Sequence, residues 1–375
     1  MNNLQSLRKN EFNLREERLK NAKKQNLRYQ KREKQHLNIT YVMTWTGVCG
    51  GSKIILEHAN RLTDRGHKIT LISHDNKPVW FNLNEKVEFI QVPWESVLCE
   101  SIPKDTDVIV ATYWREIYEC VEQKIAPVIY FEQGDFHLFD LEKVDNRTYN
   151  YINKALKTIH FTYTVSSFAK AKLKEVYNTE AKVIPNAVDD KVFYYEPHKK
   201  NEVPNITIIG SEEATFKRIQ NIIDAIEIVK EKGYNIKLNW ITPTKPEKNI
   251  NLLPIINPPQ IVIGDTLRKT DIYICASMYE AFCLPVLEAM TCGAAIITTN
   301  NGGNMDFIEE NKNALIIEKD NINDIVQKVE TLLNNQDLRE SLVKNVVEEA
   351  ARYSWNIKIN KVEEYYQEIA NYVVE

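Results

Sequence analysis

The sequence predicts an α/β protein made of two doubly wound domains, each with a parallel sheet covered by helices. Three observations support this prediction. The 375 residues are enough for two domains with separate cores. From about residue 37, short apolar runs of strand length alternate with helical segments. The same alternation begins again at residue 205, after a stretch that contains Pro197 and Pro204 and that we interpret as a linker.

The composition is that of an ordinary globular protein, with 43% apolar and 27% charged residues. The net charge of −4 does not suggest a nucleic-acid partner. No apolar run approaches the roughly 20 residues that a membrane-spanning helix needs, and the N-terminus has no apolar signal core. We therefore expect a cytoplasmic protein. Its six cysteines form no C-x-x-C pair, so we expect reduced thiols.

Residues 1–36 differ in composition from the rest of the chain. They hold eleven lysines or arginines against four glutamates, a net charge of +7, and no glycine or proline. We predict a basic helical extension. Three interpretations are open: a solvated helix, a helix that contacts anionic lipid headgroups at the inner face of the membrane, and a helix packed on a partner subunit or on the protein's own body. The broken apolar stripe does not choose among them; its positions are Leu4, Leu7, Phe12, Leu14 and Leu19.

The first predicted domain covers residues 37–188. A strand at 37–44 leads through Gly50 and Gly51 into a helix from Ser52, so unbonded N–H groups lie at a helix start. Alone, such a glycine pair serves packing about as often as binding. Further strands are expected at 67–73, 87–92, 107–112, 127–131, 161–165 and 182–184, with helices at 114–124, 146–160 and 166–177.

A polar cluster follows the expected strand at 127–131. It contains Gln133, Asp135 and His137, which are residue types suited to hydrogen-bonding sugar hydroxyls. Ordinary loop polarity explains the cluster equally well.

The second predicted domain covers residues 205–354 and follows a linker at 189–204. Strands are expected at 205–209, 236–241, 261–264, 272–276, 294–298 and 314–317. Helices are expected at 217–232, 285–290, 304–310, 322–333 and 336–352, followed by a terminal helix within 355–375.

The stretch from Asp271 to Gly303 reads as strand, loop, helix, strand and a glycine pair, which is a βαβ unit. Ligands of such units bind at the carboxyl ends of the strands, beside helix N-termini. Glu280 lies in the loop, and Glu288 lies inside an apolar helical stretch, where a buried acid needs a partner. Taken singly, each glutamate is more often a solvated surface acid.

The segment E-A-F-C-L-P-V-L-E resembles the E-x7-E signature of retaining glycosyltransferases of the GT-B fold, and in particular the family 4 enzymes. The resemblance extends through Gly302 and Gly303, includes a P-N-A-V-D turn at 185–189, and covers most of residues 38–370. It implies a GT-B fold of two Rossmann-like domains facing a cleft, with a terminal helix that crosses back to the first domain. Departures from the family pattern are Ala187, Ala281 and Cys283 for glycines, Ala295 for proline and Ser211 for arginine.

The resemblance also implies roles for particular residues. Glu280 would lie by the transferred sugar, and Lys217 would stabilise the diphosphate leaving group, so both are candidate catalytic residues. Glu288 would accept hydrogen bonds from the ribose. The backbone groups of the E-x7-E segment, the glycine loop and two further positions would complete the donor site; they are Phe282, Cys283, Leu284, Gly50, Gly51, Gly303 and Arg218. Gln133, Asp135 and His137 would border the acceptor and the sugar.

The function implied is hexose transfer from a nucleotide diphosphate sugar, with a UDP-sugar favoured, to a glycan, lipid-linked or surface-polymer acceptor. The cleft loops contain no D-x-D motif, so the sequence requires no metal or other cofactor. Two alternatives are open: a sugar-nucleotide epimerase of the same fold, and a non-catalytic subunit that stabilises an active partner.

Overall fold

The computed structural model describes residues 3–197, 201–246 and 253–375. The chain divides into two compact units. Unit 1 comprises Met1–Ile184 together with Ile359–Glu375, and unit 2 comprises Pro185–Lys358. The basic extension is therefore part of unit 1, and the C-terminal segment returns to the same unit.

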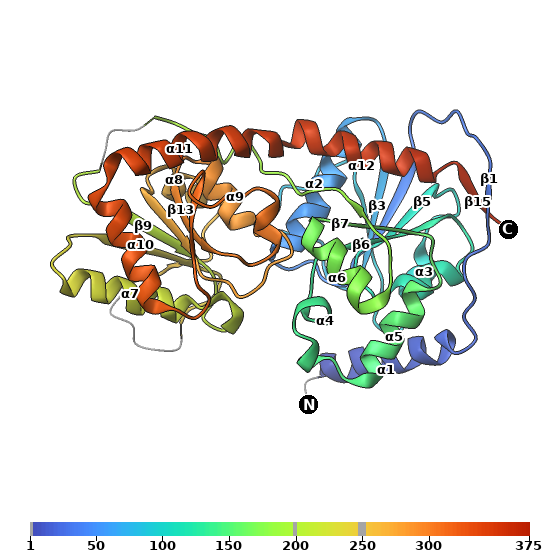
Figure 1. The fold of residues 1–375 in the computed structure, drawn as a ribbon. Coiled ribbons are helices and arrows are strands. Elements are labelled where there is room, and N and C mark those ends of the chain that lie inside the picture. The colour runs from blue at the N-terminus through green and yellow to red at the C-terminus, as the bar shows by residue number, and fades with distance from the viewer. Residues whose placement is uncertain (1–2, 198–200, 247–252) are drawn as a thin grey trace. The chain divides into compact units, whose positions relative to one another are not determined.

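Unit 1 is built on a parallel sheet whose strands lie in the order β4-β3-β2-β5-β6-β7-β8; Figure 1 labels β3, β5, β6 and β7 of this sheet. This doubly wound order places the carboxyl ends of all seven strands along one edge. The strands are β2 (Asn38–Val42), β3 (Lys68–Ser73), β4 (Glu88–Gln91), β5 (Val108–Ala111), β6 (Val128–Glu132), β7 (Phe161–Thr164) and β8 (Lys182–Val183). All lie within or next to the predicted strands.

Several helices of unit 1 begin at a residue whose side chain caps the helix N-terminus. Asp145 caps the helix at 146–156 and Ser166 caps the helix at 167–177, each by accepting a bond from a backbone N–H. The helices are α1 (Asn3–Leu19), α2 (Gly50–Asp64), α3 (Ile117–Glu122), α4 (Phe136–Phe139), α5 (Asn146–Leu156) and α6 (Ser167–Tyr177). Short 3-10 turns lie at Leu98–Ser101 and Leu141–Lys143.

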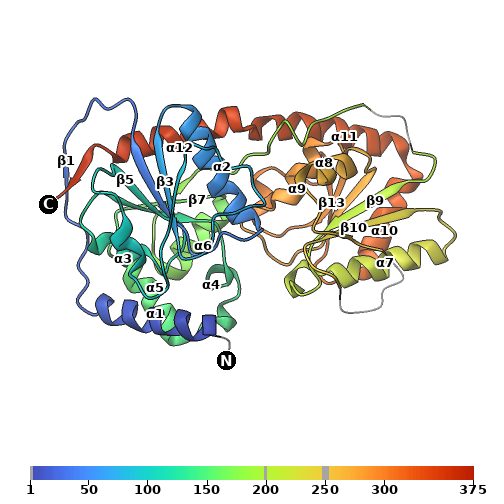
Figure 2. The same ribbon diagram turned by 180° about the vertical axis from the view of Figure 1, so that it is seen from behind.

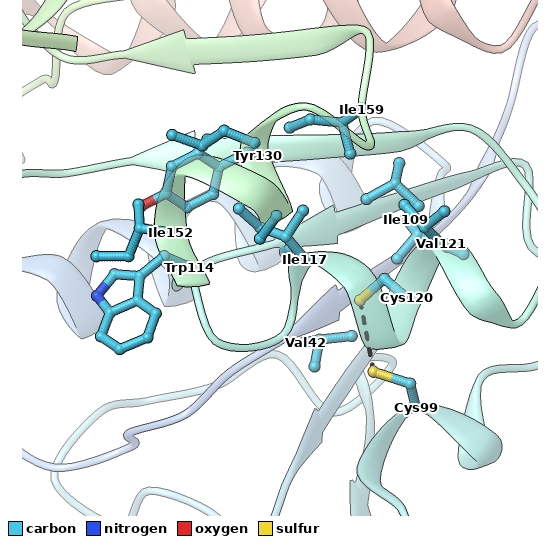
Figure 3. Close-up of a cluster of buried hydrophobic side chains, with 14 of the residues drawn as sticks. Val42, Cys99, Ile109, Trp114, Ile117, Cys120, Val121, Tyr130, Ile152 and Ile159 are labelled. Carbon is cyan, nitrogen blue, oxygen red and sulfur yellow. Dashed lines mark hydrogen bonds between the residues drawn. The ribbon is translucent and has the colours of Figure 1, made fainter. Parts of the chain in front are cut away.

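One core cluster of unit 1 lies between one face of the sheet and the helices α3 and α5. Figure 3 shows Val42, Ile109 and Tyr130 of the sheet packing towards Ile117 and Ile152 of these helices. Their side chains are at most 1% exposed, so this face of the sheet is shielded from water. The packed sheet supports the loops at the strand ends.

The basic extension forms α1, which packs on unit 1 beside α5 (Figures 1 and 2). Phe12 lies between the rings of Trp114 and Tyr151, and Leu19 belongs to the core. Arg15 is 4% exposed and pairs with carboxylates, at 2.8 Å for Glu11. Of the three interpretations of this segment, packing on the protein's own body is the one observed. The side chain of Leu4 lies outside the described part, and Leu14 is exposed.

Not all of the extension is helical. Residues Leu27–Tyr29 form β1, which pairs antiparallel with β15 (Tyr372–Val374). Helix α12 (Trp355–Ile369) accordingly ends before the strand at 372–374, where a continuous helix was expected. Pairing of two segments that are more than 340 residues apart overrides the local helix preference.

The C-terminal part of α12 is anchored in unit 1 by a cluster of tyrosines. The hydroxyl of Tyr366 lies 2.7 Å from that of Tyr163 and receives a hydrogen bond from Tyr41 at 3.1 Å. All three phenols are buried. These bonds hold the C-terminal part of α12 within unit 1, to which residues 359–375 belong.

Unit 2 is also built on a parallel sheet, in the order β11-β10-β9-β12-β13-β14. Its strands are β9 (Asn205–Ile209), β10 (Lys237–Thr242), β11 (Ile255–Ile256), β12 (Ile272–Cys275), β13 (Ala295–Thr299) and β14 (Ala314–Ile317). Its helices are α7 (Ile219–Glu231), α8 (Gln260–Arg268), α9 (Leu284–Thr291), α10 (Ile322–Asn334) and α11 (Gln336–Ala350), with 3-10 turns at Thr215–Lys217, Gly303–Asp306 and Ala351–Tyr353.

Two predicted elements of unit 2 are wrong. The run at 261–264 was expected to be a strand but lies in α8, because a four-residue apolar run does not distinguish a strand from a buried helix turn. The helix expected at 304–310 is only the 3-10 turn Gly303–Asp306. The predicted α/β class, with a doubly wound parallel sheet in each half, is confirmed.

Candidate active site

Two loops at the carboxyl edge of the unit 2 sheet bring Lys217 and Glu280 together. Lys217 ends the 3-10 turn after β9, and Glu280 lies in the loop after β12. The backbone N–H of Met278 donates to Phe216 O at 2.8 Å, and the rings of Phe216 and Tyr279 stack at 4.9 Å. These contacts hold the loops side by side. Lys217 Nζ lies 2.5 Å from Glu280 Oε1.

The Lys217 side chain is only 19% exposed. Burial by itself lowers the pKa of a lysine, but the adjacent Glu280 carboxylate reverses this and raises the pKa of Lys217 above its ordinary value. Lys217 is therefore cationic throughout the physiological range. Ser277 donates a further bond to Glu280 Oε1 at 3.0 Å, which orients the carboxylate.

The start of α9 offers unbonded backbone donors. Among the described residues, no acceptor contacts the N–H groups of Phe282, Cys283 or Leu284. Such groups at a helix N-terminus attract anions. Cys283 has φ 69°, in the left-handed region that favours glycine. The family's usual glycine at this position is thus explained by the backbone, and the cysteine adopts the same conformation.

The side chain of Phe282 does not take part in this arrangement. It is 3% exposed and packs on Phe307 and Tyr353. Only its backbone is available to a ligand.

The glycine pair after β13 shapes the Glu280 loop. The N–H of Gly303 donates to Glu280 O at 3.0 Å, and the N–H of Glu280 donates to Asn301 O at 3.0 Å. A Cβ on Gly303 would lie 2.3 Å from the carbonyl carbon of Ala281, so no other residue fits. Since its N–H is occupied, Gly303 contributes by positioning Glu280.

Glu288 lies on α9 and is 8% exposed. Its charge and that of Glu280 both add to the rise, caused mainly by burial, in the pKa of Tyr273. The two carboxylates therefore lie within electrostatic range of one phenol on β12.

The two other positions expected to hold a diphosphate are engaged elsewhere. Arg218 forms a two-point ion pair with Asp320, through Nε at 2.5 Å and Nη2 at 3.1 Å. Ser211, in the place of the family's arginine, lies 3.3 Å from the hydroxyl of Thr244. The described structure thus supplies Lys217 as the cation beside the E-x7-E loop.

In unit 1, a cavity of about 390 Å³ lies at the carboxyl edge of the sheet. Its lining includes Gly51, Gln133 and Asp135, and Gln133 Nε2 donates to Gly51 O at 3.2 Å. The glycine loop and the polar cluster predicted from the sequence therefore meet at one cavity. The N–H groups of Gly50 and Gly51, at the start of α2, have no acceptor among the described residues.

His137 lies behind this cavity. It is fully buried, and its Nε2 is 3.0 Å from Glu132 Oε2. Burial would raise the pKa of Glu132, but His137, the Tyr130 hydroxyl and the Gly134 N–H lower it below its ordinary value. The structure does not bring His137 to the cavity surface.

The same cavity has a cationic and aromatic lining that the sequence did not predict, and this lining includes Arg8, Tyr113 and Arg115. No local motif marks these residues, because they come from α1 and from the loop between β5 and α3. The described residues contain no cluster of three or more histidine, cysteine or acidic side chains that could hold a metal. None of their helices is both long and apolar enough to cross a bilayer.

Residues 193–349 match the family model described as glycosyl transferases group 1. Two curated relatives are similar over parts of the chain. An uncharacterised glycosyltransferase of Methanocaldococcus jannaschii is 28% identical over 217 residues, which are 55% of this chain and 59% of that protein. The capsular polysaccharide biosynthesis glycosyltransferase CapM of Staphylococcus aureus is 28% identical over 139 residues, 34% of this chain and 37% of that protein. The chain thus spans less than two thirds of the length of either relative.

Solved structures extend the similarity to both units. Alr3699/HepE of Anabaena, in complex with UDP-glucose, superposes with a TM-score of 0.73 at 14% identity, over 89% of this chain and 99% of that chain. A glycosyltransferase of Rickettsia africae superposes with a TM-score of 0.72 at 20% identity, over 90% and 99%. Residues 193–349 thus match the glycosyl transferases group 1 family, and the chain has the GT-B fold predicted from its sequence.

Proposed function

We propose that this protein is a retaining, metal-independent glycosyltransferase that moves a hexose from a nucleotide diphosphate sugar, with UDP as the nucleotide, to a glycan, lipid-linked or surface-polymer acceptor. The observation that carries the proposal is the Lys217–Glu280 pair beside the unbonded N–H groups that begin α9. This places one fixed cation, one carboxylate and a set of anion-binding amides at the ligand-binding edge of a doubly wound sheet.

Each group has a role in the transfer. As the bond between sugar and diphosphate breaks, negative charge grows on the departing phosphate, and Lys217 with the amides of Cys283 and Leu284 neutralises it. Glu280 lies against the transferred sugar, where it orients hydroxyls or stabilises positive charge at the anomeric carbon. Glu288 accepts hydrogen bonds from the ribose hydroxyls.

The similar proteins support the choice of donor and acceptor. The Anabaena structure holds UDP-glucose on the same fold. The similarity to a capsular polysaccharide glycosyltransferase favours a surface-polymer acceptor. Both enter the proposal by analogy.

A thermal-shift screen with UDP, GDP, ADP and dTDP tests the donor. UDP should raise the melting temperature of the wild-type chain and raise it less in Lys217→Ala. If millimolar UDP does not change the melting temperature but another nucleotide raises it, that nucleotide, and not UDP, belongs to the donor. Donor turnover without acceptor is then followed by separating UDP-glucose from its products. Slow release of glucose and UDP supports a transferase, whereas conversion to an epimeric sugar without loss of the nucleotide supports the epimerase.

One observation favours the non-catalytic alternative. Lys217 has no second cation to help it bind the diphosphate. Ser211 is uncharged and lies beside Thr244, and Arg218 is paired with Asp320. A chain that binds UDP but neither hydrolyses UDP-sugars nor transfers from them, alone or with acceptor glycans, would be a stabilising subunit.

A further inference from the structure

Two arginines of unit 1 differ from every other arginine in the described part of the chain. Among the described residues, neither Arg8 on α1 nor Arg115 after β5 has an ion pair or a guanidinium hydrogen bond, and both guanidinium groups lie over aromatic rings. The Nε atoms of both are buried without a partner. By contrast, Arg15 and Arg18 on α1 and Arg147 on α5 each pair with glutamates. The other guanidinium nitrogens of Arg8 and Arg115 are not buried in this way, so two unpaired cations face a cavity and are available to an anionic ligand.

Aromatic rings hold both guanidinium groups in place. Arg8 lies over Trp45 and Trp94, with its guanidinium carbon 5.9 and 5.6 Å from the ring centroids. Arg115 lies 5.0 Å from Trp114 and 5.3 Å from Phe12. Stacking on ring faces fixes the position of a guanidinium while leaving its in-plane N–H donors available.

Both arginines line the cavity of about 390 Å³ that also holds Gly51, Gln133 and Asp135. The acids of this lining are already engaged. Asp135 accepts from the Tyr113 hydroxyl at 2.7 Å and from the N–H of Phe136 at 2.7 Å. Glu132 accepts from Gly134 at 2.6 Å and lies 3.0 Å from His137. The charge of Arg115 also acts on Glu11, but that carboxylate is bonded to Arg15 and His74.

The cavity also receives the start of α2, a helix of 15 residues whose first N–H groups, on Gly50 and Gly51, have no acceptor among the described residues. Two guanidinium groups and a helix N-terminus that converge on one polar cavity form an anion site, and the forked donors of arginine match phosphate oxygens.

We infer that this cavity binds a phosphate group of the acceptor, held by Arg8 and Arg115. The inference rests on the proposed function and narrows its acceptor to a phosphate-bearing molecule, such as a polyol phosphate polymer or a phosphorylated glycan. The inference also assigns a binding role to the basic N-terminal helix, because α1 contributes one of the two cations.

The test uses the full chain and sn-glycerol 3-phosphate as the probe, with uncharged glycerol as its blank, and measures affinity by calorimetry. Wild type should bind the probe in the millimolar range and not bind glycerol. Arg8→Gln and Arg115→Gln should each weaken binding about tenfold or more, as expected for loss of a charge-assisted bond. Arg8→Lys keeps the charge and should retain most of the affinity, which separates a binding role from a packing role.

Arg18→Gln is the matched control, because Arg18 lies on the same helix and pairs with Glu122 outside the cavity. It should bind the probe like wild type. Absence of probe binding by wild type at tens of millimolar, or an equal loss in Arg18→Gln, would overturn the inference.

UDP distinguishes an acceptor phosphate from the donor's own diphosphate. Saturating UDP should leave glycerol phosphate affinity unchanged, and the Arg8 and Arg115 variants should bind UDP like wild type. Competition between the two ligands, with loss of UDP affinity in both variants, would assign the cavity to the donor and refute the acceptor assignment. A wild-type chain that binds glycerol phosphate but no nucleotide would instead refute the proposed function alone.

Discussion

Lys217 Nζ and Glu280 Oε1 lie 2.5 Å apart, although the two residues are separated by 62 others in the chain. The pair joins the loop after β9 to the loop after β12, the two central strands of the unit 2 sheet. A buried lysine is held cationic by its carboxylate partner, and the carboxylate is held in one orientation by Ser277. Pre-oriented charges of this kind stabilise a transition state without reorganisation during the reaction.

Lys217→Ala should lower UDP-sugar turnover by roughly a hundredfold, by analogy with the loss of an oxyanion donor. The physical reason is that no other described cation of unit 2 lies beside Glu280. Turnover is measured as release of UDP. Lys232→Ala is the control, since Lys232 pairs with Glu330 at the far end of α7 and should keep wild-type turnover. An unchanged rate in Lys217→Ala would remove this residue from the catalytic site.

Glu288→Gln should weaken UDP binding about tenfold to a hundredfold, because an amide accepts hydrogen bonds from ribose hydroxyls less strongly than a carboxylate. Calorimetric titration with UDP measures the effect. Glu330→Gln, on the surface near Lys232, controls for the charge change and should bind UDP normally. Wild-type UDP affinity in Glu288→Gln, in a chain with a normal melting temperature, would exclude contact with the ribose.

Gly303→Ala should destabilise unit 2 by about 1–3 kcal/mol and abolish most donor turnover. The new Cβ would collide with the backbone of Ala281 and displace the adjacent Glu280 carbonyl. Denaturant unfolding measures the first effect and UDP release the second. Gly233→Ala is the comparison, since its Cβ would meet nothing within 4 Å and only its φ of +97° is unfavourable. Gly233→Ala should therefore unfold more easily but leave the turnover of the folded enzyme unchanged.

Glu116→Gln should stabilise unit 1 increasingly as the pH rises from 5 to 8. Burial raises the pKa of Glu116 to about 7 from the ordinary 4.5, although Arg15 and Thr44 oppose the shift. Between these values the folded chain keeps a proton that the unfolded chain has released, so the native Glu116 loses stability with rising pH. The variant should match wild type near pH 5 and exceed it by about 1–3 kcal/mol at pH 8.

The measurement for Glu116 is the free energy of unfolding in urea at pH 5, 6.5 and 8. Glu122→Gln, which changes a half-exposed acid in the last turn of α3, the helix that follows Glu116, should show no such trend relative to wild type. A difference between Glu116→Gln and wild type that is constant with pH would contradict the titration of Glu116 in this range.

Most of the fold could be predicted because its determinants are local. Apolar runs of strand length, cap residues such as Ser166 and the glycine pair that begins α2 each act over a few neighbours. The strand Leu27–Tyr29 could not be predicted in this way, since its partner is the other end of the chain. Helix α8 was missed because the apolar run at 261–264 fits both secondary structures.

Some features of the candidate site could likewise be predicted from the sequence, and others are seen only in the tertiary structure. The sequence alone determined the two α/β units, the spacing of Glu280 and Glu288, and the glycines that shape their loop. These features depend on short-range sterics and on hydrophobic periodicity, which are properties of neighbouring residues. Only the tertiary structure decided that Lys217 pairs with Glu280, that Arg218 turns to Asp320, and that His137 is buried. It also brought Arg8 and Arg115 to one cavity. Such pairings depend on which side chains the packed sheets and helices bring within a few ångströms of one another. The separation of two residues in the sequence does not indicate whether they will come into contact.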